Sequence, residues 1–135
     1  MRIVGFIKHK PLHILIDSGS THNFLDIEYA NTLGCEFEQI PSQTVTIADG
    51  NKLACQYKCK NFTWRVNGVT FVTDVLLIPI GSCDMVLGIQ WLRTLGEINW
   101  NFKDMTMKFH IREQTFCFKG VSEKRLQVVE GSFPL

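Results

Sequence analysis

"HILIDSGSTHNFLD", residues 13–26, decides the fold of this chain, because it places a carboxylate where a short apolar run meets a polar turn. Asp17 follows four residues typical of a buried strand. An aspartate in such a place often caps the next helix or shapes the turn. Thr21, His22 and Asn23 lie nearer the helical pattern that follows and are expected to cap it without Asp17. The Asp17 carboxylate is then available for chemistry.

The composition is that of one ordinary folded domain. With 135 residues, 45% of them hydrophobic, the chain is long enough for one core and too short for two typical domains. Its 14 basic and 13 acidic residues give a net charge of +1, so we expect no nucleic-acid partner. The longest apolar run, residues 75–80, is far shorter than the roughly 20 residues that cross a bilayer. Since no signal-peptide pattern is visible either, we expect no membrane partner and an intracellular, cytoplasmic location.

The cysteines do not indicate a metal site. There are five, at irregular spacing and with no CxxC pair. Cys55 and Cys59 could meet as ligands on a helix, but their segment has the pattern of a strand. A site of Asp17, His22 and Asp26 is possible by element type, although its spacing matches no recurrent metal pattern. We therefore expect free buried thiols, no metal and no cofactor.

Short alternating or β-branched runs separated by turn residues predict an all-β domain. The expected strands lie within residues 3–7, 13–16, 43–66, 68–80, 85–88, 105–111 and 112–120. Two dipeptides, Asp49-Gly50 and Asn67-Gly68, favour the positive φ angles of tight hairpin turns. The first of these hairpins carries polar arms and is expected to project from the body.

Two segments change to helical spacing. Apolar residues recur at three- and four-residue steps from Phe24 to Leu33, and Gly34 is placed to end a short helix there. Residues 89–96, "IQWLRTLG", predict a second short helix after the buried run "MVLG". The fold class is therefore all-β with one or two short helices.

A nucleophilic serine is one reading of the polar turn. Ser18 and Ser20 lie close to His22 and Asp26, but no GxSxG elbow is present, and such near neighbours rarely converge into a triad. This reading is therefore weak.

A pair of carboxylates is the stronger reading. Hydrolysis of a peptide by water needs a base that takes a proton from the water and an acid that gives one to the carbonyl oxygen. Two carboxylates that share one proton do both. Gly19 lets the backbone aim N–H groups at Asp17, and the Ser18 hydroxyl can bond to a neighbouring loop. Each residue of the turn then has a function.

This chemistry requires a second acid, and the chain has one Asp-Ser-Gly. The remaining aspartates, none of which has the Ser/Thr-Gly continuation, are Asp26, Asp49, Asp74, Asp84 and Asp104. One copy per chain implies two chains. A symmetric dimer would place Asp17 and its mate at the two-fold axis, each loop supplying half of one active site.

Three motifs carry a resemblance to a known family. "LIDSGSTHNFL", "TIADGNKLACQ" and "CDMVLGIQWLRTLGEINWNFKDMTMKF" follow one another in about residues 2–109. In order and spacing they resemble retropepsin-type aspartic proteases, most closely those of gypsy-type long-terminal-repeat retrotransposons of plants. The resemblance implies a retropepsin-like, or acid-protease, closed β-barrel or sandwich that works as a single-lobe homodimer.

The resemblance also implies roles for individual positions. Asp17 matches the catalytic aspartate, and its loop is supported by Ser18, Gly19 and Ser20. The flap hairpin that covers the substrate has its tip at Ala48, Asp49, Gly50 and Asn51. The strand that packs under the active-site loop contains Val86, Leu87 and Gly88. Ile47, Leu77, Ile78 and Ile89 are either walls of substrate pockets or ordinary core.

The implied function is that of a homodimeric aspartic endopeptidase that cleaves extended peptides and processes its own retrotransposon polyprotein. Residues 1–110 form the protease domain. Residues 111–135 are expected to hold a terminal strand and a tail, with residues 121–135 as a linker toward a reverse transcriptase domain. The expected location is the cytoplasm, within retrotransposon particles. The alternative is a catalytically silent dimerisation or binding module with the same fold.

Overall fold

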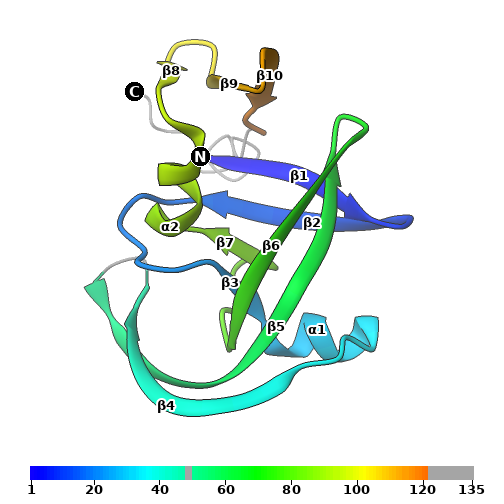
Figure 1. Cartoon of the computed structure of the whole chain (residues 1–135), viewed down its shortest axis with the longest axis vertical. Coiled ribbons are helices and arrows are strands. Elements are labelled where there is room, and N and C mark those ends of the chain that lie inside the picture. The colour runs from blue at the N-terminus through cyan, green and yellow to red at the C-terminus, as the bar shows by residue number, and fades with distance from the viewer. Residues whose placement is uncertain (48–49, 122–135) are drawn as a thin grey trace, which may run out of the picture.

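A seven-stranded sheet, closed on itself, forms the body of the molecule (Figure 1). The computed structural model describes residues 1–47 and 50–121. Strands of the large sheet follow the order β1-β2-β7-β3-β6-β5-β4, and a further pairing of β1 with β5, Phe6 opposite Arg65, closes it. A separate three-stranded sheet has the order β10-β9-β8. The predicted all-β fold with one or two short helices is confirmed, and the structure has two.

The bounds of the elements follow the chain. The first half contains β1 (Arg2–Ile7), β2 (Lys10–Ile16), β3 (Phe24–Asp26), α1 (Ile27–Leu33), β4 (Glu38–Thr46) and β5 (Lys52–Val66). The second half contains β6 (Val69–Ile78), β7 (Met85–Leu87), α2 (Ile89–Leu92), the 3-10 turn η2 (Arg93–Leu95), β8 (Ile98–Asn101), β9 (Thr106–Ile111) and β10 (Gln114–Lys119). No helix in these described ranges is long and apolar enough to cross a bilayer.

Both predicted hairpins are present. Between β5 and β6 the turn is made by Asn67 and Gly68, with φ angles of 53° and 79°, as the dipeptide predicted. The β4–β5 hairpin closes with a hydrogen bond from the Ile47 N–H to the Asn51 carbonyl, 2.9 Å long. Two residues of its predicted tip, 48–49, lie outside the described residues.

The predicted start of the first helix was wrong. Phe24 and Leu25 are fully buried and belong to β3, which lies between β6 and β7 and pairs with both. The helix is capped by Asp26, whose carboxylate accepts a hydrogen bond from the Tyr29 N–H at 3.2 Å, and not by Thr21, His22 or Asn23. Burial and pairing on both edges of β3 override the local helical pattern. Gly34 ends the helix as predicted, with φ 69°.

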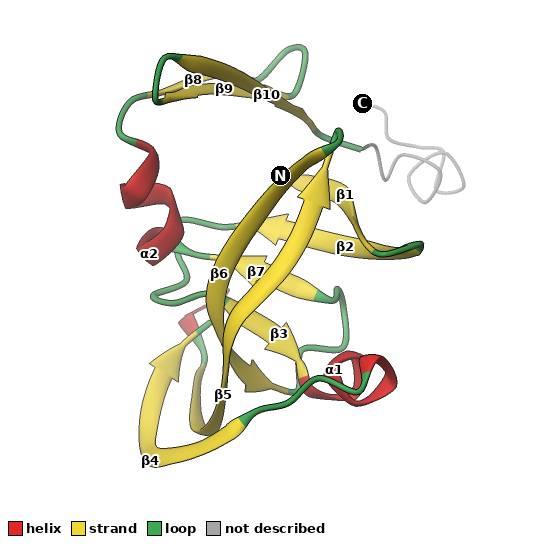
Figure 2. Ribbon diagram, turned by 45° about the vertical axis from the view of Figure 1, so that its right-hand side comes forward, coloured by secondary structure: helices red, strands yellow, loops and turns green. Residues whose placement is uncertain are grey.

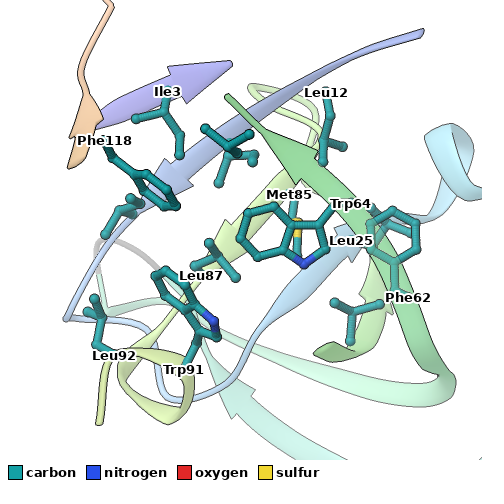
Figure 3. Packing of buried hydrophobic residues seen from close by; sticks show 14 of the residues in the cluster. Ile3, Leu12, Leu25, Phe62, Trp64, Met85, Leu87, Trp91, Leu92 and Phe118 are labelled. Carbon is teal, nitrogen blue, oxygen red and sulfur yellow. The ribbon is translucent and has the colours of Figure 1, made fainter. Parts of the chain in front are cut away.

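An aromatic cluster joins the small sheet to the barrel (Figure 3). Trp91 of α2 stacks on Phe118 of β10, with ring centroids 6.1 Å apart, and meets Trp64 of β5 edge to face at 5.8 Å. Phe118 is 2% exposed, so the last strand expected in residues 112–120 is part of this core. α2 is therefore held from both sides, which fixes the chain segment that follows β7.

The cysteines are free thiols. Cys55, Cys59 and Cys83 are buried as predicted, whereas Cys35 is half-buried and Cys117 is exposed. Burial raises the pKa of the Cys59 thiol to about 11. The described residues contain no group of three His, Cys, Asp or Glu side chains that could hold a metal ion.

Candidate active site

The loop that carries Asp17 is fixed by hydrogen bonds at its first residues. β2 runs parallel to β7, with Ile16 opposite Leu87, and the Asp17 N–H continues this ladder by donating to the Leu87 carbonyl at 3.0 Å. The chain then turns back, and the Ser20 N–H donates to the Asp17 carbonyl at 3.1 Å. The half-buried Asp17 thus sits at the end of a central strand, on a backbone that cannot move independently of the sheet.

Gly19 holds the Asp17 carboxylate. Its N–H donates to Asp17 Oδ1 at 2.8 Å, and a Cβ at this position would lie 3.1 Å from the same oxygen. That contact is tighter than most Cβ contacts in proteins, so a side chain here would press on the carboxylate. A backbone N–H that points at a carboxylate oxygen fixes the direction of the carboxylate.

The two serines of the loop differ in environment. Ser18 is exposed and lines a hollow of about 550 Å³ beside the loop. Ser20 is fully buried, and its Oγ has no hydrogen-bond partner among the described residues. The Ser20 carbonyl accepts a hydrogen bond of 2.8 Å from the Ile89 N–H, which ties the loop to the start of α2.

Gly88 packs directly against the loop, although of the predicted strand of Val86, Leu87 and Gly88 only the first two belong to β7. A Cβ on Gly88 would lie 2.3 Å from the His22 carbonyl oxygen and 2.6 Å from that of Ser20. Only a glycine fits this approach of two backbones. Val86 and Leu87 are buried in the strand before it.

Asn23 is the site residue that sequence reasoning missed. The sequence pattern predicts a helix cap at Asn23, but the residue is 5% exposed, and its Oδ1 accepts a hydrogen bond from the Gly88 N–H at 3.1 Å. This bond joins the end of the Asp17 loop to β7. One sequence signal for this role is that Asn23 directly precedes the apolar pair Phe24-Leu25. An amide side chain that is buried with such a pair needs a hydrogen-bond partner.

The base of the β4–β5 hairpin, the predicted flap, is also attached to the loop. The Thr21 N–H and Oγ1 donate to the Thr46 carbonyl at the end of β4, at 3.2 and 3.3 Å. Gly50 and Asn51 of the predicted tip are exposed, while Ala48 and Asp49 lie outside the described residues. The hairpin therefore rises from a point four residues beyond Asp17.

The candidate pocket walls divide into two groups. Leu77 and Ile78 are 2% and 1% exposed and belong to the core. Ile47 and Ile89 are half-buried, and Ile89 lines the hollow beside the loop.

The weaker readings find no support in the contacts. Thr21 Oγ1 lies 2.8 Å from His22 Nδ1, so this histidine is paired with a threonine of the loop. Asp26 caps α1 and also accepts from the Ile80 N–H at 2.8 Å, which commits it to structure. A serine triad or a metal site that needs both residues is therefore disfavoured.

The other described aspartates are bound elsewhere. Asp74 accepts from the Asn61 N–H and pairs with a lysine, Asp84 accepts from the His13 N–H, and Asp104 is bonded within the turn after β8. Together with Asp26, these account for all aspartates apart from Asp17 in the described part of the chain. One chain thus presents a single oriented carboxylate at this loop.

Comparison with known proteins identifies a family and a fold. A family model described as "Retroviral aspartyl protease" matches residues 3–112. Among solved structures, the retroviral protease-like domain of Ddi1 from Leishmania major has a similar fold, with a TM-score of 0.68 and 13% identity. The match covers 91% of this chain and 94% of that one, which confirms the expected retropepsin-like fold. No match is found among curated proteins.

Proposed function

This chain belongs to the retroviral aspartyl protease family, and from this premise we propose that it is a homodimeric aspartic endopeptidase. The observation that carries the proposal is the oriented carboxylate of Asp17, held by the Gly19 N–H at 2.8 Å on a loop with no second acid among the described residues. Two chains facing each other at this loop supply the missing carboxylate.

The proposed reaction uses one water molecule between the two Asp17 carboxyl groups. The ionised carboxylate takes a proton from the water while the water oxygen adds to the peptide carbonyl carbon. The protonated carboxyl group gives its proton to the carbonyl oxygen in the same step. The C–N bond of the resulting gem-diol then breaks as the nitrogen receives a proton from one carboxyl group and a gem-diol hydroxyl returns its proton to the other carboxylate. The products are one carboxylic acid and one amine, and the pair ends with the proton count with which it began.

The flap hairpin supports a peptide as the substrate. The bonds between Thr21 and Thr46 place its base beside the Asp17 loop. Its exposed residues Gly50 and Asn51, with Ala48 and Asp49 of the predicted tip, are proposed to cover an extended peptide and to hydrogen-bond to its backbone, as in strand addition to a sheet edge. Side chains alternate along such a peptide, so specificity would come from pockets on either side of it.

The finer identity rests on the sequence resemblance. We propose that the domain comes from a gypsy-type retrotransposon polyprotein and processes that polyprotein in the cytoplasm, within particles. The protease domain is proposed to occupy residues 1–110, followed by a terminal strand and a linker. A catalytically silent binding module is the alternative.

A matched pair of proteins tests the proposal. The whole chain and its Asp17→Asn variant are incubated with a peptide library and with the polyprotein segment around the domain, and the products are identified by mass spectrometry. The substitution keeps size and polarity but removes the ionisable acid, so cleavage should fall by at least about 10³-fold while far-UV circular dichroism and dimer content stay unchanged. Cleavage at the wild-type rate by the variant contradicts the proposal. A wild-type dimer that cleaves nothing favours the silent module.

A further inference from the structure

A second hollow of the molecule is separate from the Asp17 loop. Its volume is about 810 Å³, and it is lined by the turn between β1 and β2, by the end of α1 with the residues after it, and by the middle of β5. None of its described lining residues belongs to residues 17–23. Figure 2 shows α1 at the side of the barrel and the loop that runs from it into β4. The second hollow thus contains no residue of the proposed reaction.

Two cysteines line the second hollow and contact each other. Cys35 is half-buried and Cys59 is 6% exposed, and both are free thiols. Their side chains are hydrogen-bonded, with the Cys59 S–H directed at the Cys35 sulfur. Side chains that converge in this way meet the first geometric requirement of a disulfide.

The backbone keeps the two thiols together in the folded chain. The Cys35 N–H donates to the Ala30 carbonyl at 3.1 Å, which fixes the residue at the end of α1. Cys59 lies opposite Val75 of β6, just before a bulge in the pairing of β5 with β6. Cys35 also packs against the core cluster that contains Cys59. In the unfolded chain the same thiols are separated by about 25 residues, so folding is what brings them into contact.

The cysteine pair lies at the open end of the β4–β5 hairpin. The ladder of this hairpin ends with Glu38 opposite Lys58. Cys59 is the next residue of β5, and Cys35 precedes Glu38 by three positions. A bond between the two sulfurs would close a loop that contains all of β4 and the arm of β5 paired with it. The hairpin of the predicted flap would then be tied at its base.

The environments of the two thiols assign them different roles. Burial raises the pKa of the Cys35 thiol, and the hydrogen bond from Cys59 partly offsets this rise. Burial also raises the pKa of Cys59 to about 11, and the neighbouring Cys35 and Asp74 add to the rise. Since the thiolate is the attacking species, Cys35 reacts first with an oxidant and Cys59 reacts second.

The charge of the second hollow suits an anionic oxidant. Basic side chains outnumber acidic ones in its lining, with Lys8, His9, Lys10 and Lys60 against Glu36. Lys60 also lies 3.7 Å from Glu38, so Lys8 and Lys10 contribute most of the excess positive charge. Oxidised glutathione has more carboxylates than ammonium groups, and a positive hollow raises its local concentration.

We propose that Cys35 and Cys59 form a reversible disulfide by exchange with oxidised glutathione, and that this bond ties the base of the β4–β5 hairpin. The Cys35 thiol loses its proton, its sulfur attacks one sulfur of the oxidant, and the S–S bond of the oxidant breaks. One glutathione thiolate leaves and takes up a proton. Cys59, deprotonated in turn, attacks the Cys35 sulfur of the mixed disulfide and releases the second glutathione. The protein thiols lose two electrons and two protons, and the oxidant gains both.

The test maps the disulfides of the whole chain in buffers of reduced and oxidised glutathione. Free thiols are blocked with N-ethylmaleimide, the chain is digested, and linked peptides are identified by mass spectrometry. Cys35→Ser is the test variant. Cys55→Ser is its control, because Cys55 is also a buried thiol of β5 but does not line the second hollow. A Cys35–Cys59 peptide should dominate in the wild type and in the control and be absent from Cys35→Ser.

Two magnitudes are expected from the length of the closed loop. A bond between residues about 25 apart restricts the unfolded chain, so the equilibrium constant for its formation should be about 100-fold larger in the folded chain than in urea. By the same linkage, oxidation should raise Tm by about 5–15 °C at one protomer concentration, and it should not do so in Cys35→Ser. Amide hydrogen exchange in β4 should be slower in the oxidised chain.

The opposite results overturn the inference. These are a Cys35 that carries glutathione without linking to Cys59, a Cys35 that links as often to Cys55 or Cys83, and equal equilibrium constants in the folded and unfolded chains. Unchanged amide exchange in the fully oxidised chain overturns the tie at the hairpin base. If Cys35→Ser does not fold, the peptide map and the equilibrium constants of the wild type decide. None of these measurements uses cleavage, so their result is independent of the proposed protease activity.

Discussion

Replacing Gly88 by alanine should lower the stability of the protein and displace the Asp17 loop, because the added methyl group would meet backbone atoms. The new Cβ would lie 2.3 Å from the His22 carbonyl oxygen and 2.6 Å from that of Ser20. Neither oxygen can rotate away as a side chain can. Since carbon and oxygen atoms approach no closer than about 3.3 Å even in favourable C–H···O contacts, β7 and the loop must separate by about 1 Å.

A separation of this size would break two hydrogen bonds. The Gly88 N–H donates to Asn23 Oδ1 at 3.1 Å, and the Ile89 N–H donates to the Ser20 carbonyl at 2.8 Å. An added 1 Å takes both beyond hydrogen-bonding range. Overpacking costs about 1–3 kcal/mol and each lost bond about 1 kcal/mol, so we expect a loss of roughly 3–5 kcal/mol. This loss is a large part of the free energy of unfolding of a typical domain, which is about 5–15 kcal/mol.

The assay compares urea unfolding of wild type, Gly88→Ala and Gly34→Ala at one protomer concentration, because dimer formation would make the stability depend on concentration. Gly34 has φ 69° and open space around its Cβ position, so its substitution should cost only about 1–2 kcal/mol of backbone strain. Where Gly88→Ala is still folded, a 1 Å displacement of the loop should lower cleavage about 100-fold. Wild-type stability and wild-type cleavage for Gly88→Ala would refute the reasoning.

Two further substitutions probe the site and its support. Asn23→Leu leaves the buried Gly88 N–H without an acceptor and should lower the free energy of unfolding by about 1–3 kcal/mol in urea titrations, so a change below about 0.5 kcal/mol would argue against this role. Burial, with a contribution from nearby Asp84, raises the pKa of Tyr29 to about 12, whereas its value in the unfolded chain is near 10. The folded state therefore holds the phenol proton more tightly, and the protein loses stability as pH rises from about 10 to 12. Tyr29→Phe removes the hydrogen bond to the Pro11 carbonyl and should lower the free energy of unfolding by about 1 kcal/mol at neutral pH. Between pH 9 and 12 the variant should lose less stability than the wild type. Equal losses in urea titrations over this pH range would contradict the assignment.

The features that were predictable from the sequence have local causes. The turn at Asn67-Gly68 needs two positive φ angles, and these residue types tolerate them at low cost. Gly34 ends α1 for the same reason. The Asp17 turn was also recognisable, because a strand, an acid and a glycine within a few residues leave few ways to orient the carboxylate.

The features that sequence reasoning missed depend on partners far along the chain. β3 is three residues long and is a strand only because β6 and β7, about 50 residues later, pair with its two edges. The same contacts give Asp26 its position, where it caps α1 and also accepts from the N–H groups of Ile80 and Gly81. Asn23 could not be assigned without Gly88, which lies 65 residues away. A pattern within one segment contains none of this information.

These long-range bonds make the Asp17 loop and α2 one mechanical unit. The Ile89 N–H bond to the Ser20 carbonyl starts α2 at the Asp17 loop, and α2 then places Leu92 in the wall of the hollow beside that loop. Trp91, on the same short helix, is held against Phe118 of β10 by ring stacking (Figure 3). Because the helix has four residues and is fixed at both ends, any displacement of α2 would move a support of Asp17.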